Sequence, residues 1–431
     1  MLNLILSAMK TLNALIGKSL RYSATAVALI ISAVLTAQEV DYNLVNGVIK
    51  DAKTKERVVF ATISVPGTTI GTVANADGEF TLKVPKTVKS NVFEITHLGY
   101  QNTQFPIVNG TSGKDKVYLI EPSSLEIQSV VIRPMDARTI LEGALKNIDK
   151  NYSDKPVSFT AFYRESIKQR REYISIAEAV AEIYKAPYRY TLETDKVKIV
   201  KGRRGENVKK ADTLMVKMQG GPHVSLYLDV IKNPELILTR EDLPYYNYEV
   251  VDVVKIDNEA NYVISFTPNT KLEYPLYQGK LYINTENLAI TMAEFSIDLS
   301  EPEKVAQIFV RKKPAGLIFE PISTNYLVTY KKVNDKYHVN YMRSEVKFRA
   351  DWRKRIFKTN YTIMSEMAIT ERNFDNVNKI TFKESFKPNL ILADRVNEYF
   401  DENYWGSYNT IEPDESIQSA ISKFNKRFRK Q

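Results

Sequence analysis

The sequence predicts a mainly β protein with an N-terminal β-sandwich, a linker helix, and then a large antiparallel β-sheet or half-barrel domain with few helices. Three observations support this class. Apolar and polar residues alternate in many short runs, as in strands with one buried face. Gly, Pro, Asn and Asp separate these runs at turn positions. Helical spacing is confined to a few segments, and 431 residues suffice for about two or three domains.

Residues 1–37 have the order of a secretory signal peptide. Three basic residues precede the apolar run from Ala24 to Ala37. This run is shorter than the roughly 20 apolar residues that cross a bilayer. We therefore expect export to the periplasm or outer membrane, with translation starting at Met9 and the mature chain beginning near Gln38.

The composition restricts the kinds of site that an exported chain can build. It has no cysteine, which excludes disulfides, thiolate metal ligands, a catalytic thiol and a thioether-linked lipid. The formal charge is +9 with the leader, which contributes three basic and no acidic residues. The remaining moderate excess is compatible with an anionic membrane face or a glycolipid. We expect no nucleic-acid partner.

Residues 44–133 carry the pattern of a small β-sandwich. Every second residue is apolar from Ala61 to Val65 and again from Phe80 to Val84, so each run predicts a strand with one buried face. Between them, Asn75-Ala76-Asp77-Gly78 tolerates left-handed backbone and predicts a tight reversal. A series of such strands favours a sandwich.

Several short segments of this region occur in a characteristic order. They are Gly47-Val48-Ile49, Asp51, Lys55-Glu56, Ala61-Thr62-Ile63, Gly67-Thr68, Gly71-Thr72, Asp77-Gly78-Glu79-Phe80, Ile95-Thr96-His97-Leu98-Gly99-Tyr100 and Leu125-Glu126-Ile127-Gln128-Ser129-Val130. In this order they resemble the carboxypeptidase regulatory-like (transthyretin-like) domain of Bacteroidetes envelope proteins. The resemblance implies an envelope adhesion or positioning module and carries over no activity.

An amphipathic linker helix is predicted at residues 136–151. Asp136 is a good N-cap, and the residues behind it place one apolar face toward a core. The apolar positions at helical spacing are Ile140, Leu141, Ala144, Leu145 and Ile148.

Residues 156–412 are expected to form a β-rich domain, in which strand signals dominate to about residue 385. One hairpin is expected around Asn284–Asn287, and another around Asn334–Lys336, where Tyr326, Val328 and Tyr330 would face Tyr337, Val339 and Tyr341. The only convincing interruption is a short helix over Val224–Ile237, broken by Pro234. Long antiparallel strands with a single covering helix favour a curved sheet or half-barrel. A last helix and a basic tail are expected at 413–431.

A second resemblance covers this large region. Its stations are Phe162-Tyr163-Arg164-Glu165, Gln219-Gly220-Gly221-Pro222, Tyr277-Gln278-Gly279-Lys280-Leu281-Tyr282-Ile283 and Trp405-Gly406-Ser407-Tyr408-Asn409-Thr410-Ile411-Glu412-Pro413. They resemble the C-terminal region of Bacteroidetes proteins named only for their carboxypeptidase-like regulatory domain, a region of undefined function. The strand pattern also looks like the half-barrels that carry lipoproteins or sense lipid in the periplasm.

The sequence contains no recognisable catalytic or metal-binding motif. None of the three histidines, His97, His223 and His338, opens the His-x-x-Glu pair of a zinc hydrolase. Neither a Gly-x-Ser-x-Gly motif nor a phosphate-binding glycine loop occurs. We therefore predict no catalytic residue, metal or cofactor. The rival hypothesis is a hydrolase that uses carboxylates without histidine, for which the candidates are Glu165, Glu172 and Glu178.

The loop of Gly220, Gly221, Pro222 and His223 is the candidate ligand-binding segment. Paired glycines let a backbone approach a ligand or a neighbouring strand closely, and the alternative is a tight turn capping the next helix. We expect this turn to close one rim of an apolar concave face. The basic residues between Lys198 and Lys210 form either a solvated hairpin end or an anion-binding edge.

These features favour a nonenzymatic, exported envelope protein with a binding or scaffolding role. A lipid, a glycan or an outer-membrane protein is the expected partner. A lipid- or lipoprotein-handling half-barrel is the first alternative, and the carboxylate hydrolase is the second. The basic tail, with Phe424 and Phe428 among its lysines and arginines, is compatible with peripheral membrane contact.

Overall fold

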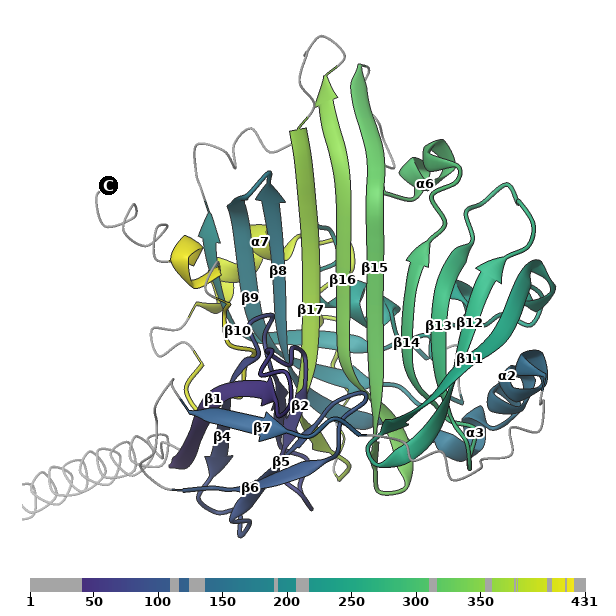
Figure 1. Cartoon of the computed structure of the whole chain (residues 1–431). Helices are drawn as coiled ribbons and strands as arrows, with labels where there is room; N and C mark the ends of the chain where they lie inside the picture. Colours follow the sequence, from purple (N-terminus) through teal and green to yellow (C-terminus); the bar gives the residue numbers. More distant parts are fainter. Residues whose placement is uncertain are drawn as a thin grey trace, which may run out of the picture.

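The computed structural model describes residues 41–108, 116–123, 136–189, 193–206, 217–309, 316–352, 359–375, 377, 379–400, 405–414 and 417–421. The expected signal peptide, the Leu125–Val130 segment and the basic tail lie outside these residues. Three sheets are formed, and two of them belong to the N-terminal region (Figure 1).

The N-terminal region is a small sandwich of a three-stranded and a four-stranded sheet, in the orders β4-β1-β7 and β3-β2-β5-β6. Alternating burial along β1 and β4 confirms the expected one-sided strands. Aromatic rings of Phe80, Phe93 and Tyr118 pack together between the sheets. The strands are β1 (Tyr42–Asp51), β2 (Thr62–Ser64), β3 (Gly71–Val73), β4 (Glu79–Pro85), β5 (Val92–Thr96), β6 (Thr103–Pro106) and β7 (Val117–Ile120).

Two short helices follow, where the sequence predicts one. Helix α2 (Ala137–Lys146) begins at Asp136, whose carboxylate accepts a hydrogen bond from the backbone N–H of Thr139. Asn147 ends α2, and α3 (Ile148–Asn151) follows it directly. Ile140, Leu141 and Ala144 are buried, so the expected apolar face packs into the core.

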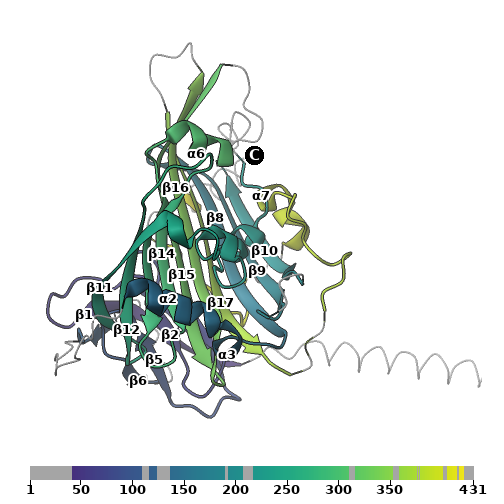
Figure 2. The ribbon, with the colours of Figure 1, turned by 90° about the vertical axis from the view of Figure 1, so that its right-hand side faces the viewer.

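The rest of the chain is organised by a ten-stranded, wholly antiparallel sheet in the order β10-β9-β8-β17-β16-β15-β14-β13-β12-β11. The sheet is curved and open, which confirms the predicted class (Figure 2). Its strands are β8 (Val157–Gln169), β9 (Glu172–Lys185), β10 (Lys196–Glu206), β11 (Tyr246–Ile256), β12 (Glu259–Pro268), β13 (Tyr277–Asn284), β14 (Ile290–Ile297), β15 (Leu317–Val333), β16 (Lys336–Trp352) and β17 (Thr359–Asn373).

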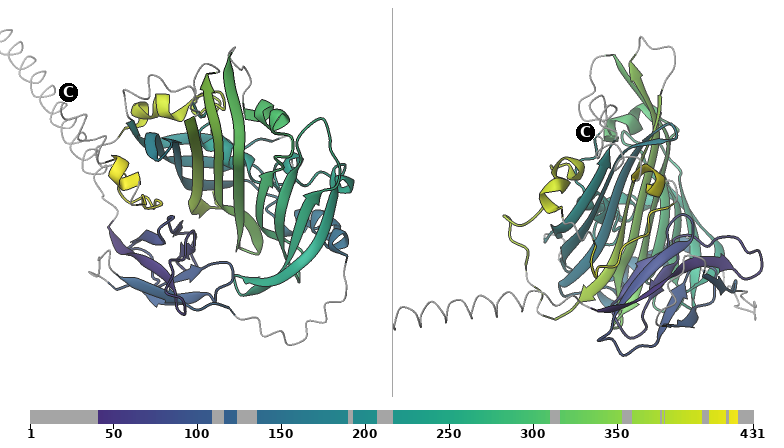
Figure 3. Two further views of the ribbon diagram at one scale, coloured as in Figure 1. Left: turned by 45° about the horizontal axis from the view of Figure 1, so that its top comes forward. Right: turned by 90° about the vertical axis from the view of Figure 1, so that its left-hand side faces the viewer.

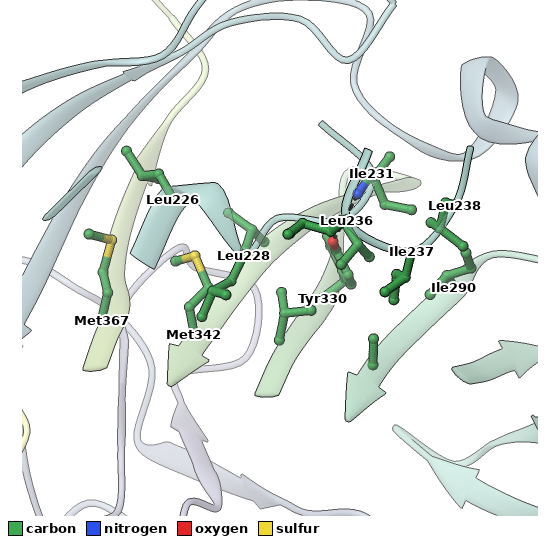
Figure 4. Packing of buried hydrophobic residues seen from close by; sticks show 14 of the residues in the cluster. Leu226, Leu228, Ile231, Leu236, Ile237, Leu238, Ile290, Tyr330, Met342 and Met367 are labelled. Atoms are coloured by element: carbon green, nitrogen blue, oxygen red, sulfur yellow. Dashed lines mark hydrogen bonds between the residues drawn. The ribbon is translucent and has the colours of Figure 1, made fainter. Parts of the chain in front are cut away.

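One face of this sheet, here called the inner face, is apolar and covered by the chain between β10 and β11. Leu226, Leu228 and Ile231 lie over the strand residues Met342, Met367 and Tyr330, among others (Figure 4). The covering elements are α5 (Pro222–Tyr227), η1 (Pro234–Leu236) and η2 (Leu243–Tyr245), with α7 (Leu392–Arg395) and η3 (Val396–Tyr399) from the C-terminal part.

The opposite, outer face carries the N-terminal sandwich and the segment of residues 405–412. Val73 of β3 and Ile411 pack with Phe162, Tyr341 and Ala368 of the sheet. The C-terminal segment runs along the sheet toward the sandwich (Figure 3). The outer face is therefore the place where three distant parts of the chain meet.

The structure corrects three details of the prediction. The helix at Val224 ends at Tyr227 instead of continuing to Ile237, because turns that bury Val230 and Ile231 follow it. A second helix, α6 (Pro302–Phe309), interrupts the strands between β14 and β15, and Pro302 at its first position was its signal. A bulge at Asn340 moves Tyr341 to the outer face, away from Tyr330.

Candidate binding site at the domain junction

The N-terminal sandwich is held on the outer face by hydrogen bonds from several separate elements. Lys331 Nζ of β15 donates to Ser64 Oγ at 2.6 Å, and Asn340 Nδ2 donates to Thr62 Oγ1 at 3.1 Å. At another point the backbone N–H of Gly99 donates to the carbonyl oxygen of Lys255 at 3.2 Å. The sandwich is therefore attached by its β2 strand and by the loop after β5.

A cavity of about 270 Å³, here called the junction pocket, lies between these attachment points. Its walls are mainly apolar, with a few polar groups among them, as is typical of small-ligand sites at domain interfaces. The sandwich contributes Phe60 and Leu98, and the sheet contributes Met292 and Leu327. Its polar groups include Thr96, His97, Asp257, Thr329 and Lys331.

Asp257 reaches the pocket because it lies in the tight turn between β11 and β12. Asp257 and Asn258 have φ angles of 50° and 62°, the left-handed pair that a two-residue hairpin turn requires. Burial raises the pKa of the Asp257 carboxyl, while the Lys331 ammonium and a hydrogen bond with Thr96 act in the other direction. The carboxyl is thus held in surroundings that disfavour its charge.

Lys331 points from the outer face of β15 into the same pocket. Burial lowers the pKa of its ammonium, and the nearby Asp257 opposes this change. Among the described residues, no ion pair joins Lys331 to Asp257. Because burial shifts the pKa values of this acid and this amine in opposite directions within one concave site, the junction pocket is the candidate functional site.

Two further polar groups define the pocket's hydrogen-bonding capacity. Thr329 Oγ1 is buried and has no hydrogen-bond partner in the described part of the chain. His97 has Nδ1 3.0 Å from the Leu98 carbonyl oxygen and Nε2 2.8 Å from the Val59 carbonyl oxygen. Because both ring nitrogens face carbonyl oxygens, His97 is held by the backbone and is not placed to ligate a metal.

The predicted glycine loop lies elsewhere, on the inner face. Gly220 and Gly221 have φ angles of 105° and 50°, and the Gly220 N–H donates to the Leu390 carbonyl oxygen at 2.8 Å. A Cβ on Gly221 would lie 3.0 Å from the Phe386 ring. The loop with Pro222 therefore forms a tight turn against the C-terminal part, and a ligand role for it stays a prediction.

The three carboxylates of the hydrolase hypothesis do not converge. Glu165 lies on the inner face, where Tyr163 Oη donates to it at 2.8 Å, and burial raises its pKa to about 7. Glu178 pairs across β8–β9 with Arg164, next to Glu165, and so points to the outer face. Glu172 lies at the hairpin end of β9. Acids on opposite faces of one sheet cannot flank a single bond.

The histidines do not come together in one site either. His223 Nε2 lies 2.9 Å from the Phe386 carbonyl oxygen, on the inner face. His338 packs edge-on against Phe159 and Phe374, and burial lowers its pKa to about 3. In the described ranges, no group of three or more His, Cys, Asp or Glu side chains is placed to hold a metal ion.

The structure does bring together two segments that the sequence singled out. The rings of Phe162 and Trp405 pack edge to face, with their centroids 5.5 Å apart. Arg164 Nη2 donates to the Ile411 carbonyl oxygen at 2.8 Å. Arg164 also pairs with Glu178 and Glu366 at 2.7 and 2.9 Å. This buried network holds the C-terminal segment on the outer face, beside the sandwich.

The model of one protein family covers the sandwich. Residues 45–132 match the CarboxypepD_reg-like domain. The carboxypeptidase regulatory-like resemblance is therefore confirmed for this region, and the junction pocket lies where the CarboxypepD_reg-like domain meets the sheet. Among curated proteins, no sequence matches the chain.

Three solved structures show remote similarity. One is a DUF1329 family protein from Desulfovibrio piger, with 12% identity, a TM-score of 0.24, and coverage of 57% of this chain and 96% of that one. Another is a LolA superfamily protein from Nitrosomonas europaea, with 14% identity, a TM-score of 0.19, and coverage of 59% and 100%. Lipovitellin, in a structure describing its lipid–protein interactions, has 8% identity, a TM-score of 0.24, and coverage of 55% and 27%.

Proposed function

We propose that this chain is an exported binding protein of the cell envelope, which holds a ligand in the junction pocket. The observation that carries the proposal is the pair of Asp257 and Lys331, which face one cavity without a direct ion pair. A ligand with both hydrogen-bond donors and acceptors would add partners to these two groups, which already bind Ser64 and Thr96, and would satisfy the unpartnered hydroxyl of Thr329.

The CarboxypepD_reg-like domain acts in this proposal as a fixed wall of the site. Its Ser64 and Thr62 bind the sheet directly, and its Phe60 and Leu98 complete the apolar lining. Export to the periplasm or outer membrane is part of the proposal and rests on the leader-like residues 1–37. In the described ranges, no helix is long and apolar enough to cross a membrane.

The inner face is less suited to a lipid than the sequence suggested. The segment from Leu226 to Leu243 fills it with buried apolar side chains that belong to one core with the sheet. A lipid bound there would have to displace this segment and expose those side chains to water, at a cost of about 25 cal/mol per Å² of apolar surface. We therefore place the ligand on the outer side.

Native mass spectrometry of the protein purified gently from an envelope fraction tests the proposal. Lys331→Met and Asp257→Asn remove the polar pair, and asparagine tolerates the left-handed φ at position 257. Their controls are Lys332→Met, on the neighbouring exposed residue, and Asp335→Asn, in an exposed turn with a φ of 60°.

We expect a bound small molecule on the wild type and both controls, and loss of it from both pocket variants. Thermal melts on all five proteins check that the pocket variants remain folded. Equal occupancy in all five, or no bound mass in any of them, would contradict the proposal.

A further inference from the structure

A second hollow adjoins the junction pocket on the outer face. This outer groove has a volume of about 400 Å³ and crosses β13 to β16. It opens where β14 and β15 separate, because their ladder ends at the pair Phe295–Tyr326. Beyond that pair the Thr324 hydroxyl, in place of a backbone carbonyl, accepts the hydrogen bond of the Ile297 N–H, at 2.8 Å.

The outer groove and the junction pocket share part of their lining. Glu294 and Leu327 line both of them, one from β14 and one from β15. Arg343, which lines the groove, also lies over the Phe60 ring of the N-terminal domain, 4.8 Å from its centroid. A ligand whose end enters the pocket can therefore extend along the groove.

The charged side chains that line the groove balance one another. Lys280 and Arg343 provide two positive charges, and Glu294 and Glu345 provide two negative ones. Arg343 and Glu345 pair at 3.2 Å, and Tyr282 Oη donates to Glu294 at 2.9 Å. Charged groups that neutralise one another in this way create no field of one sign for a phosphate or another multiply charged ligand.

Uncharged groups in the groove are available for a ligand. The side chains of Gln278, Ser296 and Asn325 make no hydrogen bond to any described residue, and they line the groove from β13, β14 and β15. Amide and hydroxyl groups both donate and accept, as the hydroxyls of a sugar do. Leu327 is the one aliphatic side chain among the residues that line the groove.

We propose that the outer groove binds a neutral oligosaccharide, one end of which occupies the junction pocket. This inference rests on the proposed function, because it names the ligand class of the same site. Sugar hydroxyls bind the amides and hydroxyl along the groove. The apolar face of a terminal sugar ring packs in the pocket against Leu98 and Met292.

Isothermal titration calorimetry of the mature chain with maltohexaose, cellohexaose and chitohexaose tests this inference. The double variant Gln278→Ala/Asn325→Ala removes two groove amides. Its control is Asn247→Ala, on an exposed position of β11 in the same sheet. Heparin hexasaccharide and phosphatidylglycerol vesicles probe the anionic and lipid alternatives.

We expect at least one neutral hexasaccharide to bind, with about tenfold weaker affinity in the double variant and in Lys331→Met and no change in the control. Binding that the double variant leaves intact would overturn the groove assignment. Binding of heparin or vesicles in place of neutral sugars would overturn the ligand class. If no hexasaccharide binds while native mass spectrometry finds a molecule that depends on Lys331, this inference fails and the proposed function stands.

Discussion

The side-chain amide of Asn409 makes two hydrogen bonds with the backbone of Lys83, as a residue of a neighbouring strand would. Asn409 Oδ1 accepts from the Lys83 N–H at 2.7 Å, and Asn409 Nδ2 donates to the Lys83 carbonyl oxygen at 3.0 Å. The Thr72 hydroxyl donates to the neighbouring Thr410 carbonyl oxygen at 2.9 Å. The C-terminal segment thus fastens the N-terminal domain to the sheet.

Asn409→Ala should loosen this attachment. The variant leaves a partly buried N–H and carbonyl of Lys83 without partners, so we expect a loss of about 1–3 kcal/mol in the free energy of unfolding. Urea unfolding measures it, and hydrogen exchange of β4 should quicken. Ser407→Ala, on an exposed residue of the same segment, is the control. Equal stability of the two variants would contradict a fastening role.

Arg164→Met should be among the most damaging single changes in the sheet. Glu178 and Glu366 would remain buried without the guanidinium that binds both of them. Removing one partner of such a network costs about 3–5 kcal/mol. The control is Arg349→Met, which breaks an exposed pair with Glu320 and should cost no more than about 1 kcal/mol. Similar urea midpoints for the two variants would be evidence against the buried network.

Glu165→Gln should change how stability depends on pH. The folded chain raises the pKa of Glu165 from 4.5 to about 7 because of burial, so its protonated form is favoured by folding. That stabilisation is complete below the unfolded pKa and is lost as the pH rises through about 7. A neutral glutamine avoids the loss.

As the pH rises from about 5 to about 8, the free energy of unfolding of Glu165→Gln should therefore increase relative to that of the wild type, by up to about 3 kcal/mol. Urea unfolding at a series of pH values measures this gain. Glu273→Gln, on an exposed residue, should show no such trend. If the free energies of unfolding of Glu165→Gln and the wild type differed by the same amount across this pH range, the raised pKa of Glu165 would be refuted.

Gly221→Ala separates backbone strain from crowding at the inner-face turn. Gly221 and Gly67 have positive φ angles of 50° and 72°, but a Cβ on Gly221 meets Phe386 and Leu392, whereas one on Gly67 meets nothing within 4 Å. Both alanine variants incur backbone strain, which is about 1–3 kcal/mol at Gly221 because its ψ of −130° lies outside the left-handed helical region. Only Gly221→Ala should add a packing cost, which thermal melts would show as a larger decrease in Tm. Equal decreases would mean that the turn is not tightly packed.

Local patterns predicted most strands, because a strand with one buried face alternates apolar and polar residues in the sequence. The hairpin of β13 and β14 around Asn284–Asn287 follows from it directly, as do the one-sided strands that begin at Ala61 and at Phe80. The change of face at Tyr341 does not, since a bulge shifts the alternation by one residue and leaves no compositional signal.

The junction pocket could not be predicted in the same way. Its residues extend from Val59 to Asn340 and come together only when the sandwich packs on the outer face. Asp257 and Lys331 look like an ordinary turn residue and an ordinary strand lysine until that packing encloses them. The sequence favoured the glycine loop as a candidate site because paired glycines can be recognised in a sequence, whereas the enclosure of a charge by a distant domain cannot.

The ligand is proposed to bind in the junction pocket and not on the inner face. Hydrogen exchange of the protein, with and without the molecule released in native mass spectrometry, distinguishes these two positions. We expect slower exchange at residues 59–62, 96–98 and 327–331, with residues 219–228 unchanged. Protection confined to residues 219–228 and 386–396 would instead place the ligand on the inner face and overturn the proposed function.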